Sequence, residues 1–178
     1  MAMLFADIKL KILNNLNKLL KIDQFKVREL TIGEIQISKI VFGDLIDYQK
    51  VKVLNHPYLP WQPAGIIMAP NGYIHLKDVD YCEDFSCESM GYQAVFIHEM
   101  AHIYQHQRHV NVLLRGAILQ SAMYLTFGKY NPYRYRFIEG KAYFSYNIEQ
   151  QGDIAKDIYL NRIENIILQT TEPTNTTH

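Results

Sequence analysis

Residues 97–107, with the sequence IHEMAHIYQHQ, are the part of the chain that determines its fold and its chemistry. They place His98, Glu99 and His102 in the pattern HExxH on an otherwise apolar stretch with helical character. Four residues are a little over one helical turn, so the two histidines project from one face and can share one tetrahedral ion. Glu99 is turned by about 100 degrees from His98, where it can take a proton from water beside the ion.

Burial argues that these side chains hold a metal. Two imidazoles and a carboxylate are costly to desolvate without partners, and one ion satisfies both rings together. The sequence therefore predicts zinc on His98 and His102, with Glu99 as the general base; zinc would lower the pKa of water to about 7 and polarise a carbonyl. The alternative is a pair of core histidines that donate to backbone carbonyls.

A catalytic zinc needs a third protein ligand from elsewhere in the chain. On an unbroken helix His106 lies a full turn beyond His102. His109 would need a glycine at position 105, where the chain has Gln. We expect Glu149 to be the ligand. The five downstream candidates are His106, His109, Glu139, Glu149 and Asp153, with Glu139 in reserve.

Glu149 lies near the start of a predicted helix that Asn147 and Gln150 can cap. Asp153 follows four residues later on the same face, where it can accept the free ring proton of a ligating histidine. Gly152 would let this helix approach the HExxH helix closely. The alternative is a solvated helix start, where two acids are favoured by the helix dipole in any case.

Two further features could belong to the site. Charge that develops on a carbonyl oxygen needs a donor, and Tyr143 and Tyr146 are the tyrosines best placed by sequence. The strand expected at residues 73–76 could hold extended substrate at a sheet edge. A plain structural hairpin and packing tyrosines are the alternatives.

The rest of the chain predicts one α+β domain over residues 1–169, with a small, mostly antiparallel sheet and further helices. Thr31 and Glu34 form a capping box that opens a helix over residues 32–42, and Gly43 suits its C-terminus. The other expected elements are a basic amphipathic helix (1–28), strands (50–54, 66–68, 73–76) with a turn at Asn71–Gly72, helices (92–107, a buried 110–127, and one from Asn147) and a disordered tail (170–178).

Composition excludes several classes of protein. The 178 residues carry 18 Lys and Arg against 18 Asp and Glu, so nucleic acid is not an expected partner. The sequence shows no secretory signal and no membrane span, and we do not expect a membrane partner. Cys82 and Cys87 make no disulfide framework. The expected location is the cytoplasm, or outside the cell through an export route that needs no signal peptide.

Residues 30–76, 84–86, 97–107 and 146–154 together resemble the small bacterial Vgr-related zincin-like proteins linked to Rhs elements and type VI secretion. The HExxH and YNIEQQGDI segments are the specific part of this resemblance. It implies a zincin-like metallopeptidase fold with His98, His102 and Glu149 on zinc and Glu99 as base. It also implies a hydrolase with a secretion-system partner of the Vgr or Rhs kind. The chemistry alone gives two expected substrates, a protein or a peptide crosslink of the bacterial cell wall, because hydrolysis of either needs the same metal and base. The alternative is a zinc-stabilised adaptor without catalytic activity.

Overall fold

The computed structural model describes residues 25–169. Three short strands form its sheet: β1 (Val27–Glu29), β2 (Lys52–Leu54) and β3 (Tyr73–His75). The α-helices are α2 (Ile32–Phe42), α3 (Met90–Gln107), α4 (Val112–Leu125), α5 (Ile148–Tyr159) and α6 (Ile166–Gln169). Single turns of 3-10 helix lie between them: η2 (Tyr48–Lys50), η3 (Asp78–Asp80), η4 (Phe85–Cys87) and η5 (Tyr143–Ser145).

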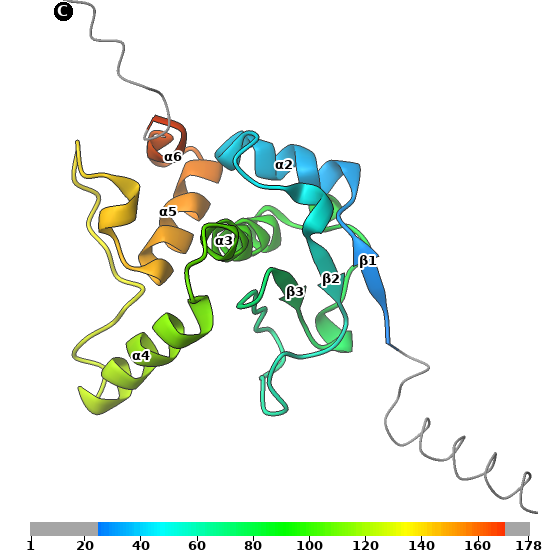
Figure 1. Cartoon of the computed structure of the whole chain (residues 1–178), viewed down its shortest axis with the longest axis horizontal. Helices are drawn as coiled ribbons and strands as arrows, with labels where there is room; N and C mark the ends of the chain where they lie inside the picture. The colour runs from blue at the N-terminus through cyan, green and yellow to red at the C-terminus, as the bar shows by residue number, and fades with distance from the viewer. Residues whose placement is uncertain (1–24, 170–178) are drawn as a thin grey trace, which may run out of the picture.

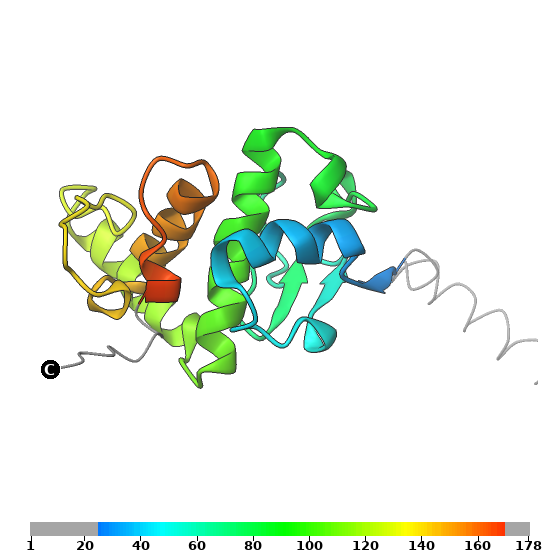
Figure 2. The ribbon, with the colours of Figure 1, turned by 90° about the horizontal axis from the view of Figure 1, so that it is seen from above.

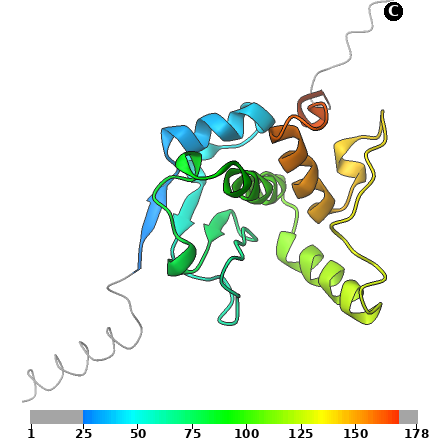
Figure 3. The same ribbon diagram turned by 180° about the vertical axis from the view of Figure 1, so that it is seen from behind.

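Helix α3 occupies the centre of the molecule, with the sheet on one side and α5 on the other (Figure 1). Its most extensive helix contact is with α5, while α2 crosses its length (Figure 2). Seen from behind, α4 leaves the end of α3 and lies away from the sheet (Figure 3). Ile97, Met100, Ala101 and Ile103 of α3 are fully buried. The HExxH helix is therefore the central core element of a mixed α+β fold.

The sheet is mixed, which corrects the expectation of a mostly antiparallel one. Strand β1 pairs antiparallel with β2, but β2 pairs parallel with β3. A parallel pair needs a crossover rather than a hairpin, and the Pro-rich residues 56–63 lie in that crossover. The predicted turn does form, because Met68 and His75 exchange both backbone hydrogen bonds and Gly72 has φ 88°. Pairing stops there as an isolated bridge, and Pro70 has no N–H with which to extend it.

The predicted capping boxes of two helices, and the predicted end of α2 at Gly43, are confirmed. Thr31 and Glu34 form both hydrogen bonds of a capping box at α2, which ends at Gly43 with φ 53°. Ser89 caps α3. Asn147 caps α5 by a second capping box, so the start of the helix that carries Glu149 is fixed by hydrogen bonds to its first backbone N–H groups.

A buried carboxylate joins α2 to the segment before α3. Glu34 is fully buried and accepts two hydrogen bonds from the guanidinium of Arg28, at 2.8 and 2.7 Å. It also accepts from the backbone N–H groups of Thr31 and Phe85. The ring of Phe85 then stacks on Phe96 of α3 with centroids 4.9 Å apart. A capping residue of α2 thus also fixes the position of the HExxH helix.

Helix α4 is not the buried helix that its apolar sequence predicts. Among its residues only Val112 is buried. The helix contacts α3 and α5, so that neighbours cover it along one side only. An all-apolar pattern indicates burial only when other elements surround the helix. The exposed apolar side chains are Leu113, Leu114, Ile118, Tyr124 and Leu125.

The expected basic N-terminal helix cannot extend to residue 28, because Val27 and Arg28 belong to β1. Its residues 1–24, and the predicted tail at 170–178, lie outside the described part of the chain. Cys82 and Cys87 are both free thiols. Within residues 25–169, no helix combines the length and the apolar character that crossing a bilayer requires.

Candidate metal centre

The structure brings together the three residues predicted to bind a metal. Helix α3 presents His98 and His102 one turn apart, with ring centroids 5.0 Å apart. The first turn of α5 supplies Glu149. Its Oε2 lies 3.5 Å from His98 Nε2 and 3.6 Å from His102 Nε2. One carboxylate oxygen therefore faces both ring nitrogens, and all three side chains are largely buried.

The spacing of these atoms suits a divalent cation. Contacts of 3.5 and 3.6 Å are long for charge-assisted hydrogen bonds, which are about 2.7–2.9 Å. Ligands at about 2.1 Å from a tetrahedral zinc ion are about 3.4 Å apart from one another. Two imidazoles and a carboxylate are also a common ligand set for catalytic zinc. The residues present fit the metal that the sequence predicts.

Each histidine has a second partner that fixes its ring. His98 Nδ1 lies 3.3 Å from Oδ1 of Asp153, as predicted from the spacing in α5. His102 Nδ1 lies 2.9 Å from Oε1 of Gln105, whose amide nitrogen donates to the backbone oxygen of Ile148. With a proton on each Nδ1, both Nε2 atoms are left free to bind a metal.

Sequence reasoning missed Gln105 because it weighed this position only as the glycine site of a longer histidine motif. The signal was present, since residue i+3 on a helix lies on the same face as residue i. Gln105 is buried, and it also donates to Gln151 on α5. It therefore ties the ring of His102 to the helix that carries Glu149.

Glu99 is the acid whose surroundings suit proton transfer. It is 6% exposed, and its Oε2 has no hydrogen-bond partner among the described residues. Burial raises the pKa of Glu99, while His102 and His98 and the backbone N–H of Ala69 oppose that rise. Its ligand atoms lie within 4.8 Å of those of both histidines. Glu99 thus lies beside the candidate metal position, with its Oε2 free of hydrogen bonds to the described residues.

Electrostatic interactions couple the candidate metal ligands to one another. Burial disfavours the charged form of His98, but Asp153 and Glu149 outweigh it and raise the pKa of His98 to about 9. Burial likewise disfavours ionised Glu149, but His102 and His98 lower its pKa to about 2. Without metal, the cluster therefore holds an imidazolium between carboxylates at neutral pH.

The structure does not bring Tyr143 and Tyr146 to this cluster. Tyr143 is fully buried and its hydroxyl donates to the backbone oxygen of Gln151. The hydroxyl of Tyr146 accepts from the N–H of Ile138. Both rings are instead buried in the core, at the turn of η5 and directly after it.

Tyr133, which was not among the predicted site residues, is affected by the charges of the site. The carboxylates of Glu149, Glu99 and Asp153 act on the phenol of Tyr133, and together with burial, the largest cause, they raise its pKa to about 12. The loop around Tyr133 is held in place because Asn147 donates to the backbone oxygen of Pro132 at 3.1 Å. In the sequence Tyr133 belongs to a tyrosine-rich connection before α5, with Tyr130 and Tyr135, and no motif there distinguishes it from its neighbours.

The remaining candidates lie apart from the metal position. Glu139 is exposed, and His106 is exposed with its ring against the backbone of Gly72. The strand expected to hold substrate, residues 73–76, is not a free edge, since β2 pairs with one side and Met68 with the other. The outer segment is instead residues 66–70, which reaches Glu99 through Ala69.

Fold and site together define a small α+β domain with a candidate helical His/Glu metal centre. No family model matches the sequence. The chain is 46% identical over 138 residues to the type VI secretion system spike protein VgrG2b of Pseudomonas aeruginosa, a match that covers 77% of this chain and 13% of that protein. The solved effector domain of the same VgrG2b superposes with a TM-score of 0.69 and 44% identity, over 79% of this chain and 78% of that one. The chain is thus homologous to the VgrG2b effector domain and belongs to the type VI secretion Vgr-related family.

Proposed function

We propose that the protein is a zinc-dependent metallopeptidase that hydrolyses an amide bond. The observation that carries this proposal is the convergence of His98 Nε2 and His102 Nε2 on Glu149 Oε2, at 3.5 and 3.6 Å. The proposal that the fold is zincin-like is supported by the resemblance of the HExxH and YNIEQQGDI segments to zincin-like proteins of the Vgr-related family. Zinc bound to His98, His102 and Glu149 would supply a Lewis acid that polarises the scissile carbonyl and acidifies water.

The chain's own residues account for the proton transfers. Glu99 Oε2, which is buried and has no hydrogen-bond partner within residues 25–169, is the atom that would accept the proton of the attacking water. Its raised pKa favours holding that proton and passing it to the leaving nitrogen of the cleaved amide. Asp153 and Gln105 keep the Nδ1 protons of His98 and His102 in place. We propose that the hydroxyl of Tyr133 donates a hydrogen bond to the carbonyl oxygen of the substrate as negative charge develops on that oxygen.

The family suggests where this activity is used. We propose a type VI secretion-associated effector that is exported with a spike protein of the Vgr kind, a route that needs no signal peptide. The substrate is an amide bond in a protein or in a peptide crosslink of the bacterial cell wall, since the two reactions need the same metal and base.

The test compares zinc-loaded wild type with Glu99→Gln on casein and on isolated sacculi. We expect cleavage of one substrate by wild type, and at least a hundredfold slower cleavage by Glu99→Gln, which should still bind one zinc ion. Zinc binding without cleavage of either substrate would contradict the peptidase and favour the adaptor. Equal cleavage by both proteins would remove Glu99 from the mechanism.

A further inference from the structure

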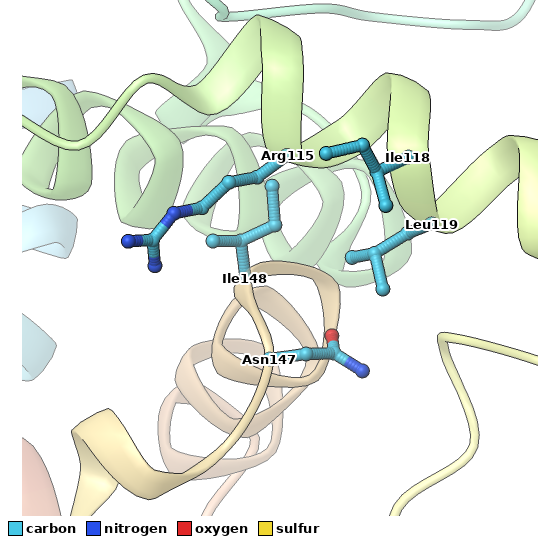
Figure 4. A pocket seen from close by; sticks show the side chains of 5 residues that line it. All are labelled: Arg115, Ile118, Leu119, Asn147 and Ile148. Atoms are coloured by element: carbon cyan, nitrogen blue, oxygen red, sulfur yellow. The ribbon is translucent and has the colours of Figure 1, made fainter.

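A small pocket lies between α4 and the start of α5, next to the proposed metal position. Arg115, Ile118 and Leu119 line it from α4, and Asn147 and Ile148 line it from α5 (Figure 4). Its volume is about 170 Å³. A cavity of about 150 Å³ holds a molecule of the size of benzene, so this pocket can hold one apolar side chain.

The pocket is adjacent to the metal ligand in sequence and in space. Ile148 directly precedes Glu149 on α5. On the opposite wall, α4 passes the carboxylate so closely that a Cβ at Gly116 would lie 3.7 Å from Glu149 Oε1 and 3.9 Å from Ile148 Cδ1. A peptide that places a side chain in this pocket can therefore also reach the proposed reaction centre.

Arg115 gives the pocket a positive charge that no acid among residues 25–169 neutralises through an ion pair. Its side chain is exposed and forms no ion pair within residues 25–169. Residues 100–138 carry five Arg and Lys and no Asp or Glu, although the whole chain is neutral. The other polar wall residue, Asn147, already uses its side chain to cap α5 and to hold Pro132. Arg115 is thus the polar group of the pocket that is available to a ligand.

We infer that this pocket is a substrate subsite that takes an apolar side chain and, through Arg115, a carboxylate on the same or the next residue. The inference deepens the proposed function and names the substrate class: peptides that carry a carboxylate, either acidic or C-terminal, beside an apolar group. Arginine suits this role because its planar guanidinium binds carboxylates through two parallel hydrogen bonds.

The first test measures binding without metal or turnover. Chelator-treated protein is titrated with N-acetyl-leucine and with N-acetyl-leucinamide, which lacks the carboxylate, and the backbone amide signals of Ile118, Leu119 and Ile148 are followed by NMR. We expect the carboxylate to bind about tenfold more tightly than the amide. In Arg115→Gln the two probes should bind equally. Lys129→Gln, which removes a charge beyond the other end of α4, should keep the wild-type ratio.

Equal binding of the two probes to wild type, an unchanged ratio in Arg115→Gln, or no shifts at the pocket would overturn the inference. Circular dichroism will check that the variants fold, as expected for exposed positions.

The second test digests a peptide mixture with zinc-loaded protein and identifies the cleavage sites by mass spectrometry. The subsite is supported if acidic or C-terminal residues are enriched next to the cleavage sites of wild type and this enrichment is reversed in Arg115→Glu. Cleavage with the same preference in Arg115→Glu overturns the subsite and leaves the peptidase intact, whereas probe binding without any cleavage overturns only the peptidase.

Discussion

The imidazole of His98 lies directly against the backbone of Gly152. A Cβ at position 152 would be 2.5 Å from Cε1 and 2.6 Å from Nε2 of that ring, so close that the ring would have to move to make room for it. Glycine costs a helix about 1 kcal/mol relative to alanine, so its presence within α5 opposes local stability. The contact explains why it is there: the two helices meet at the ring that must face Glu149.

Gly152→Ala should therefore separate stability from metal binding. Alanine favours the helix by about 1 kcal/mol, but the added methyl group displaces the His98 ring from Glu149 and Asp153. We expect the affinity for zinc to fall at least about tenfold, because ligand orientation is lost. Competition for zinc with a chromogenic chelator measures the affinity, and urea unfolding measures the stability.

Gly91→Ala is the matched control. Gly91 lies in the first turn of α3, and a Cβ there has no neighbour within 4 Å. Its substitution should leave zinc affinity unchanged and raise stability by about 0.5–1 kcal/mol. If Gly152→Ala bound zinc as tightly as Gly91→Ala does, the close packing of His98 would have no bearing on the metal.

Glu149→Gln should identify the third ligand. Elemental analysis of wild type is expected to give one zinc per chain. The amide keeps the shape of the side chain but removes the charge that faces His98 and His102, so that zinc should bind at least about tenfold more weakly. Glu139→Gln changes the exposed acid that sequence analysis held in reserve, and it should bind like wild type. If Glu139→Gln lost zinc and Glu149→Gln kept it, Glu139 would be the third ligand in place of Glu149.

The sequence predicted the local structure around the site well because short-range rules determine it. Both capping boxes and the HExxH spacing depend on residues three or four positions apart, and their geometry follows from the helix itself. The approach of Glu149 to His98 and His102 spans more than forty positions, yet it was predictable because the ligand number of zinc requires a third residue.

Contacts set by loops were beyond the same rules. Tyr143 and Tyr146 precede Glu149 in sequence, but both rings are buried and their hydroxyls bond to the backbone of Gln151 and Ile138. The carboxylates that raise the pKa of Tyr133 belong to α3 and α5, while the adjacent Pro132 is bound by Asn147, and no short-range pattern in the sequence relates these residues. The parallel pairing of β2 and β3, and the exposure of α4, depend on how long connections cross the fold, which periodicity does not record.

The stability of the metal-free protein should depend on pH through His98 and Glu149. The pKa of His98 rises from 6.5 to about 9 on folding, so its contribution is complete below pH 6.5 and is lost as the pH rises through 9. The pKa of Glu149 falls from 4.5 to about 2, so its contribution is complete above pH 4.5 and is lost as the pH falls through 2. The free energy of unfolding should therefore be highest between these limits.

Urea unfolding with chelator present should show a loss of about 1–3 kcal/mol between about pH 6 and about pH 9. Asp153→Asn removes one of the carboxylates that raise the pKa of His98, and it should make the loss smaller. Excess zinc should reverse the trend, because the metal binds deprotonated ligands and binds them better at high pH. A metal-free protein whose stability is flat over this range would contradict the imidazolium between two carboxylates.

Tyr133→Phe tests which tyrosine assists the reaction. The change removes one hydroxyl whose pKa is raised by the charges of Glu149 and Glu99. This hydroxyl forms no hydrogen bond with the proposed metal ligands. We expect kcat to fall about 100-fold, as for the loss of one donor to a developing oxyanion, with zinc affinity and stability unchanged.

Tyr146→Phe is the matched control, because it also removes one tyrosine hydroxyl. It removes the hydroxyl that accepts from Ile138, so it should lower stability by about 1 kcal/mol and leave kcat unchanged. The reverse result, a slow Tyr146→Phe enzyme and a normal Tyr133→Phe enzyme, would require the loop between α4 and α5 to rearrange when substrate binds.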